Sequence, residues 1–88
     1  MVSKYRKKPV VIEARQTGQN NDEDHFIMEW CGGRVPIMDN SPSLFIIETK
    51  EGPLYVTPGD WIIKGIAGEF YPHKPDIFAE AYEKVEEE

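Results

Sequence analysis

Apolar and polar residues alternate along much of this chain, and glycine and proline interrupt the alternation at regular intervals. Residues 44–49, 54–56, 61–64 and 69–71 are each predicted to form a β-strand, because β-branched and aromatic side chains recur in them. The segments between them hold typical turn residues: Lys50-Glu51-Gly52, Pro58-Gly59 and Gly65-Ile66-Ala67-Gly68. The pattern predicts an antiparallel meander over residues 44–72.

Two other segments have the periodicity of short amphipathic helices. The first follows a polar turn, with Asn21 or Asp22 as the expected N-cap and Gly32-Gly33 as a left-handed stop. Its apolar stripe is Phe26, Ile27, Trp30 and Cys31. The second begins at Pro75, a favourable first helical position. Its stripe, which we expect to pack on the sheet, is Ile77, Phe78, Ala81, Tyr82 and Val85.

Residues 9–15 are rich in β-branched side chains and are predicted to be the first strand. Residues 34–38 resemble a strand, but Pro36 restricts them to a sheet edge, and residues 39–43 are predicted to be a loop. The expected fold is therefore α+β: a mostly antiparallel sheet of about five strands with two short amphipathic helices packed on it.

The length of 88 residues fits one small domain, residues 1–88, and leaves no room for a second. Two Trp, four Tyr and four Phe supply large core side chains, which argues against disorder despite a net charge of -6. A domain of this size has a small margin of stability, so we expect function to lie on its surface or in a shallow cleft.

Several classes of function are disfavoured by composition. A single cysteine excludes an intramolecular disulfide, and two histidines beside it do not provide a zinc-binding pattern. The glycines at 65 and 68 join two strands instead of opening a helix, so nucleotide binding is not predicted. No apolar run approaches the roughly 20 residues that cross a bilayer. We expect a cytoplasmic protein without cofactor, metal or membrane.

Charge is distributed unevenly between the two ends. Residues 1–8 form a basic head with Lys4, Arg6, Lys7 and Lys8, whereas the end of the chain, including the tail 86–88, is acidic. Both ends are typical of solvated segments that aid solubility. The sharper alternatives are a phosphate-contacting arm at the front and a DNA-like acidic face at the back.

Four residues are candidates for chemistry, each with a simpler interpretation. Asp60 and Glu69 come from strand ends that the second hairpin brings near each other, as an acid–base pair requires, but Asp60 is better explained as a turn residue bonded to nearby backbone. His73 lies between two prolines as an accessible base or ligand, or as a plain surface residue. Cys31 is favoured as a buried inert thiol over a nucleophile.

Aromatic residues on the predicted strands are the remaining signal. Those left on an uncovered face form a binding patch for a peptide or an unpaired base, and the others pack in the core. We therefore predict no catalytic, cofactor or metal residue. The candidate interaction residues are Arg6, Lys7, Lys8, Tyr55, Trp61, Tyr71 and His73.

Residues 5–14, 58–65, 68–72 and 74–78, with the pattern PGDWIIKG, GEFYP and KPDIF, resemble a family of small uncharacterised proteins of bacteriophages and prophages. The resemblance covers roughly half of the chain. In that family the position of His73 is often another residue such as cysteine, which argues against a catalytic His73. The resemblance implies a phage or prophage origin and action in the bacterial cytoplasm, and it implies no activity.

The function expected first is a non-enzymatic interaction module that binds an unknown host or phage protein, or itself. The alternative is a nucleic-acid-associated accessory protein, or an acidic DNA mimic that acts on a host DNA-binding protein. A third class, an enzyme that uses Asp60, Glu69 or His73, requires these side chains to converge.

Overall fold

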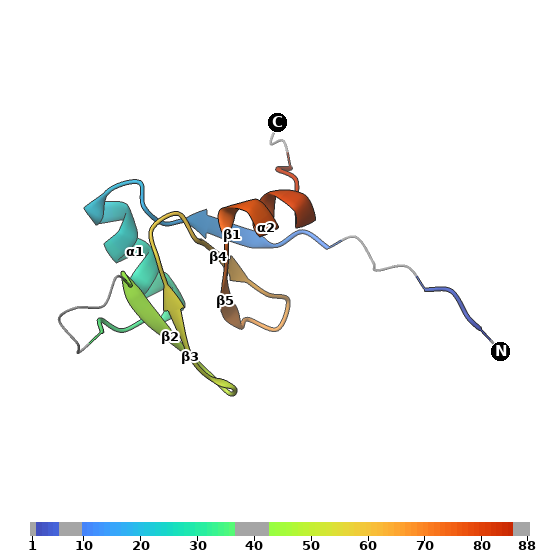
Figure 1. Ribbon diagram of the computed structural model, residues 1–88, viewed down its shortest axis with the longest axis horizontal. Helices are drawn as coiled ribbons and strands as arrows, with labels where there is room; N and C mark the ends of the chain where they lie inside the picture. The colour runs from blue at the N-terminus through green and yellow to red at the C-terminus, as the bar shows by residue number, and fades with distance from the viewer. Residues whose placement is uncertain (1, 6–9, 37–42, 86–88) are drawn as a thin grey trace.

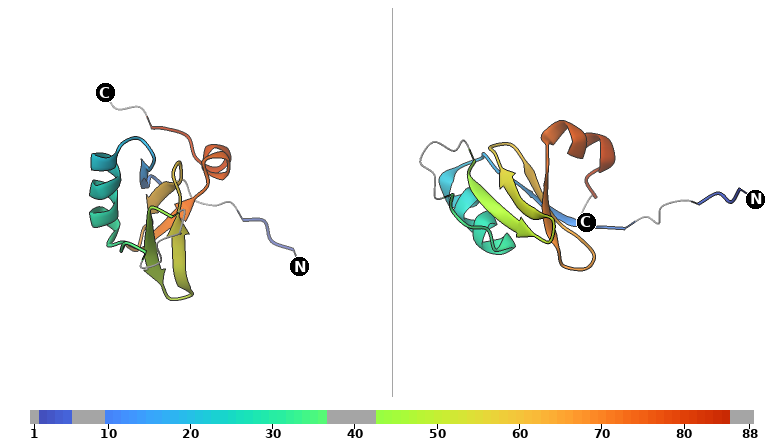
Figure 2. Two further views of the ribbon diagram at one scale, coloured as in Figure 1. Left: turned by 60° about the vertical axis from the view of Figure 1, so that its left-hand side comes forward. Right: turned by 60° about the horizontal axis from the view of Figure 1, so that its bottom comes forward.

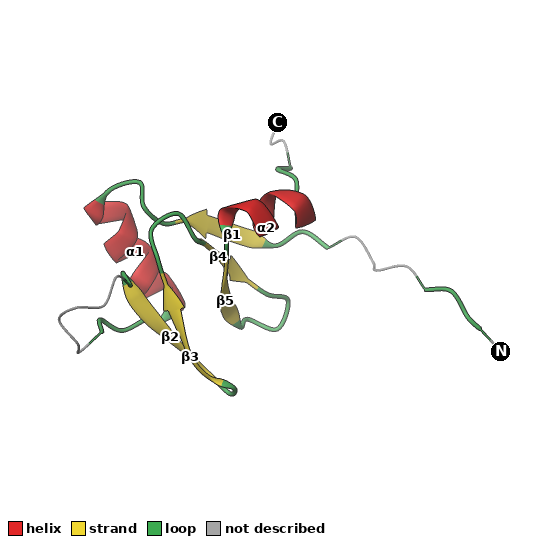
Figure 3. Cartoon of the chain, viewed as in Figure 1, coloured by secondary structure: helices red, strands yellow, loops and turns green. Residues whose placement is uncertain are grey.

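The computed structural model describes residues 2–5, 10–36 and 43–85. Five strands and two helices follow one another along the chain (Figures 1 and 3). Their bounds are β1 Glu13–Gln16, α1 Asn21–Cys31, β2 Phe45–Thr49, β3 Gly52–Val56, β4 Trp61–Lys64, β5 Phe70–His73 and α2 Pro75–Ala81. All strand pairs are antiparallel, so the predicted α+β class is confirmed.

The strands form two sheets instead of one meander. A three-stranded sheet has the order β1-β4-β5, and β2 and β3 form a separate hairpin. The predicted hairpins β2–β3 and β4–β5 are present, but the Pro58-Gly59 turn does not pair β3 with β4. The physical reason is that β1 occupies the second edge of β4, from Glu13 opposite Lys64 to Gln16 opposite Trp61.

Helix α1 begins and ends through specific caps. The Asn20 side chain accepts a hydrogen bond from the Glu23 amide at 2.8 Å, so the expected cap at Asn21 or Asp22 is wrong by one or two positions. Gly32 adopts a left-handed conformation, φ 70°, and ends the helix as predicted. Ile27 and Cys31 of the stripe are buried, whereas Phe26 is half exposed.

The core lies between α1, the β2–β3 hairpin and one face of the three-stranded sheet. Its buried members are Ile27, Cys31, Phe45, Ile47, Val56 and Ile62. Trp30 of α1 meets Phe70 of β5 edge to face, with ring centroids 5.0 Å apart, and closes this core on one side. Burial of these apolar side chains is the main stabilising contribution.

The second face of the three-stranded sheet is covered by α2. Opposed residues in the ladder share a face, so Trp61, Ile63, Tyr71 and His73 point away from the core. Phe78 of α2 stacks on Trp61 with centroids 4.3 Å apart. Figure 2 shows α1 and α2 on opposite sides of the strands.

Helix α2 is shorter and less buried than its apolar stripe predicts. It ends at Ala81, Tyr82 is the C-cap residue, and no residue of the helix is buried. Phe78 and Tyr82 make the aromatic contacts, whereas Ile77 and Val85 are exposed. Two aromatic side chains therefore carry the predicted packing of this segment on the sheet.

The first strand is shorter than predicted. Residue 9 lies outside the described residues, and residues 10–12 precede the ladder without joining it, because β4 ends at Lys64 and leaves them no partner. In the segment 34–38, which was predicted to resemble an edge strand, Arg34 forms an isolated bridge with Ile46. Residues 37–38 of this segment and residues 39–42 of the predicted loop lie outside the described residues. No helix in the described residues is long and apolar enough to cross a membrane.

Candidate functional site

An open groove of about 1020 Å³ lies between the β2–β3 hairpin and the beginning of β5. Its apolar lining is Ile47, Leu54, Phe70 and Tyr71, which come from three strands. Its other lining residues are Thr49, Lys50 and three glutamates, Glu48, Glu51 and Glu69. The groove thus combines an apolar surface with exposed charges, as sites that bind other molecules commonly do.

Two unpaired strand edges accompany this groove. Strand β3 is hydrogen-bonded to β2 alone and β5 to β4 alone, so each has a second edge without a strand partner among the described residues. The two strands are in contact with each other without forming a ladder. Unpaired edges expose backbone N–H and C=O groups that pair readily with an added strand.

An aromatic layer adjoins the groove on the α2 side of the sheet. Trp61 stacks on Phe78, Phe78 on Tyr82, and the His73 ring lies 5.3 Å from the Tyr71 ring and 6.1 Å from the Tyr82 ring. Burial, a hydrogen bond with Tyr82 and the nearby charges of Tyr82 and Glu69 raise the pKa of Tyr71 above its ordinary value of 10.0. Tyr71 belongs to both the groove and the layer, so it links them.

His73 differs from the accessible base or ligand that the sequence suggests. Its ring is half-buried between Tyr71 and Tyr82, and its Nδ1 atom is buried without a hydrogen-bond partner among the described residues. His73, the last residue of β5, therefore lies within the aromatic layer and not on an open surface. His25, in contrast, lies on the solvated side of α1, 3.2 Å from Glu29.

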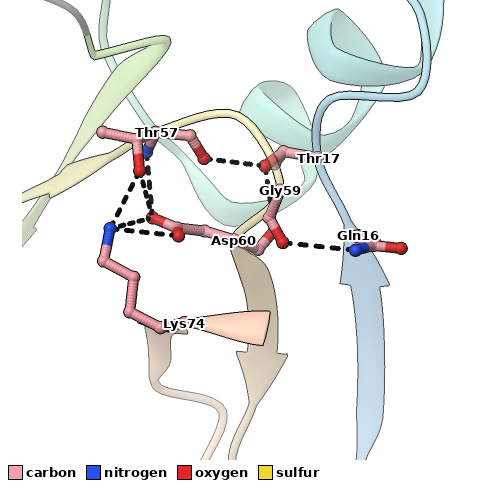
Figure 4. Close-up of polar contacts among 6 residues, drawn as sticks. All are labelled: Gln16, Thr17, Thr57, Gly59, Asp60 and Lys74. Carbon is pink, nitrogen blue, oxygen red and sulfur yellow. Dashed lines mark hydrogen bonds and ion pairs between the residues drawn. The ribbon is translucent and has the colours of Figure 1, made fainter. Parts of the chain in front are cut away.

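Asp60 is the centre of a polar cluster that joins three segments (Figure 4). Its carboxylate is almost fully buried and accepts hydrogen bonds from the Thr57 amide at 2.9 Å and the Thr57 hydroxyl at 3.1 Å. Lys74, which precedes α2, pairs with it at 3.2 Å. The interpretation of Asp60 as a turn residue bonded to nearby backbone is thus confirmed.

Thr17, at the end of β1, completes this cluster. Its amide and hydroxyl both donate to the Asp60 carbonyl, at 2.9 and 2.8 Å, and Gly59 donates to the Thr17 carbonyl at 3.2 Å. The Gln16 side chain donates to the Gly59 carbonyl. The cluster fastens β1 and the start of α2 to the turn before β4, and so it positions the aromatic layer.

The proposed acid–base pair of Asp60 and Glu69 is not formed. Trp61 is opposite His73 and Lys64 is opposite Phe70, so Asp60 and Glu69 flank opposite ends of the β4–β5 hairpin. The separation is about 15 Å at the usual rise per residue of a strand. The expectation that the hairpin brings them together is wrong. The turn of this hairpin consists of residues 65–68, so Glu69 lies beside the turn and Asp60 lies at the open end.

The other candidate residues have different positions. Tyr55 on β3 is exposed, and Trp61 is half-buried under Phe78. Arg6, Lys7 and Lys8 lie outside the described residues, as does the tail 86–88. Cys31 is buried as expected, and burial raises the pKa of its thiol above 9.0, as it does for an unreactive cysteine.

Sequence reasoning missed most of the groove. Ile47, Leu54 and Phe70 belong to strands that were correctly predicted, but their meeting depends on how one hairpin lies against the other. Among the residues that the structure describes, no group of three His, Cys, Asp or Glu residues is placed to hold a metal ion. Comparison with protein-family models, curated proteins and solved structures finds no match for this chain.

Proposed function

We propose that this protein is a non-enzymatic interaction module that binds an extended segment of a partner protein in the groove between the β2–β3 hairpin and β5. The observation that carries the proposal is the apolar lining of that groove beside two unpaired strand edges. An extended peptide that adds to an edge obtains affinity from backbone hydrogen bonds and specificity from pockets for alternate side chains.

The residues that line the groove suggest how a segment would be held. Ile47 and Leu54 are opposed in the β2–β3 ladder, and Phe70 and Tyr71 begin β5. The backbone groups of Phe70 and Pro72 face the outer edge of β5, and Pro72 has no N–H, so donation from β5 at this edge comes from Phe70. Side chains of the bound segment would contact the apolar lining while its backbone pairs with Phe70, because the backbone groups of Tyr71 face Ile63 of β4.

We place this activity in the bacterial cytoplasm, in a phage or prophage setting, with a host or phage protein as the partner. The support is the resemblance of the segments around PGDWIIKG and KPDIF, together with a composition that has one cysteine and no long apolar run. An enzyme is disfavoured because Asp60 and Glu69 lie apart, and Asp60 is occupied by Thr57 and Lys74.

The test is affinity capture from a bacterial host lysate with the tagged chain and two variants. Leu54→Glu places a charge in the groove at a partly exposed position. Ile77→Glu makes the same kind of change on the exposed side of α2, away from the groove lining, and is the matched control. Far-UV circular dichroism of all three proteins checks that the variants are folded.

We expect the wild type and Ile77→Glu to retain the same host proteins, and Leu54→Glu to lose them. Nuclease treatment of the lysate should not remove these retained proteins. Equal retention by a folded Leu54→Glu variant contradicts the assignment of the groove. Loss of all retained material on nuclease treatment contradicts a protein partner and favours the nucleic-acid alternative, in which binding weakens steeply with salt.

A further inference from the structure

The outer edge of β1 has no strand partner among the described residues. In the sheet order β1-β4-β5, β1 and β5 are the two edges, so this surface lies across the sheet from the groove. Strand β5 contains Pro72, which weakens pairing, whereas residues 10–16 contain no proline. Val11, just before β1, is 78% exposed, so the chain that leads into this edge is open to solvent.

The hydrogen bonds of Thr17 show which residues of β1 direct their backbone groups away from β4. Thr17 donates to Asp60 and accepts from Gly59, so its backbone faces the β4 side. Successive residues of a strand direct their N–H and C=O groups to opposite edges. The backbone N–H and C=O groups of Glu13 and Arg15 therefore point to β4 as well, whereas those of Ala14 and Gln16 point outward.

The side chains on this strand complement one another in charge. Glu13 and Arg15 are two positions apart, lie on one face of the sheet and are both exposed. If two copies of β1 pair antiparallel with Ala14 opposite Ala14, Glu13 of each copy is opposite Arg15 of the other. The next registers in either direction place Glu13 opposite Glu13 or Arg15 opposite Arg15, which is unfavourable.

We propose that two copies of this chain associate through the outer edges of β1, related by a two-fold axis at Ala14. In this register the outward-facing residues Ile12, Ala14 and Gln16 are opposed, so each pair exchanges its backbone hydrogen bonds. The same patch serves both copies, as a two-fold interface requires. The inference uses the edge opposite the groove and does not depend on the proposed function.

The surroundings of Arg15 fit this role. Its guanidinium lies over the rings of Phe26 and Trp30, 4.7 and 5.2 Å from their centroids. A cation–π contact leaves the N–H groups free to bond a carboxylate. Within the described part of the chain, the ion-pair partner of Glu13 is the Lys64 ammonium at 3.9 Å, and that pair is largely exposed. Both side chains can therefore form the intermolecular pair.

The experiment is a dilution series of the full chain at low salt, followed by sedimentation velocity. We expect reversible dimerisation of the wild type and about tenfold weaker association for Glu13→Arg and for Arg15→Glu, because two related ion pairs become two repulsions. The double variant Glu13→Arg/Arg15→Glu restores complementarity and should recover most of the association. Glu29→Arg on the exposed side of α1 makes the same charge change as Glu13→Arg and should associate like the wild type.

A second measurement needs no variant. Amide hydrogen exchange at low and high protein concentration should show Ala14 and Gln16 protected only at high concentration, with Glu13 and Arg15 protected at both. A wild type that stays monomeric throughout the series overturns the proposal. Association that is unchanged by Glu13→Arg, or a folded double variant that does not recover, overturns the register and the interface with it.

Discussion

Replacement of Asp60 by alanine tests the claim that the polar cluster around it holds the fold together. The carboxylate is 2% exposed and makes two hydrogen bonds to Thr57 and an ion pair with Lys74. Asp60→Ala removes the acceptor and leaves the Thr57 amide without its partner. A donor that is left unsatisfied in this partly buried position costs more than the net contribution of the bond that was lost.

The magnitude follows from the three interactions. We assign roughly 1.5 kcal/mol to the bond from the Thr57 amide, roughly 1 kcal/mol to the bond from its hydroxyl, and roughly 0.5 kcal/mol to Lys74, whose side chain is half exposed and screened by water. Asp60→Ala should thus lower the free energy of unfolding by about 3 kcal/mol. For a domain of this size, that lowers Tm by about 12–24 °C.

The assay is thermal and urea unfolding followed by far-UV circular dichroism, with Lys74→Met as the control. Lys74→Met removes the exposed ion pair and the exposed hydrogen bond from the Lys74 ammonium to the Thr57 hydroxyl, but leaves both bonds from Thr57 to Asp60, so its effect should stay below about 1 kcal/mol. The reasoning is refuted if the two variants are destabilised equally, since the cluster would then depend on the ion pair and not on the bonds to Thr57.

Three other predictions concern separate parts of the molecule. Gly18 and Gly68 have similar φ angles of 87° and 86°, but only at Gly18 would a Cβ meet backbone, the Gly59 nitrogen at 2.7 Å. Gly18→Ala should therefore be at least about 1 kcal/mol more destabilising than Gly68→Ala in urea unfolding, and equal effects would contradict the close approach. Because burial raises the pKa of Cys31, iodoacetamide should modify this thiol slowly near neutral pH and much faster in denaturant; equal rates would show an open thiol. The pKa of Tyr71 is raised in the folded state, so its contribution to stability is present below its unfolded pKa and is lost as pH rises through its folded pKa. When the free energy of unfolding in urea is measured at increasing pH, Tyr71→Phe should consequently lose less of it above pH about 10 than the wild type does. Equal losses in the two proteins would contradict this.

The two edges of the three-stranded sheet differ in how they are suited to partners. Strand β5 borders an apolar groove that can hold side chains of a partner. Its Pro72 lacks an N–H, so β5 is poorly suited to a long backbone ladder. No residue of β1 lines the groove beside β5. The charges of Glu13 and Arg15 complement those of a second copy in the proposed register. One sheet can therefore serve a partner protein at one edge and self-association at the other.

The local elements of this protein were largely determined by its sequence. Gly32 stops α1 because it tolerates positive φ, Pro75 begins α2, and the residues of β4 are those that alternation predicted. The role of Asp60 as a turn residue was also predictable, since its partner Thr57 is three positions away. These features depend on interactions between residues that are near in the chain.

Only the tertiary structure decided which strands are neighbours. Residues 13–16 pair with β4 across more than 40 residues of chain, and this contact divides the expected meander into two sheets. The same division creates the groove, and the packing of the α2 segment on the sheet encloses His73 between Tyr71 and Tyr82. Pairing between distant segments depends on the total burial and hydrogen bonding of the folded chain, which local patterns do not encode.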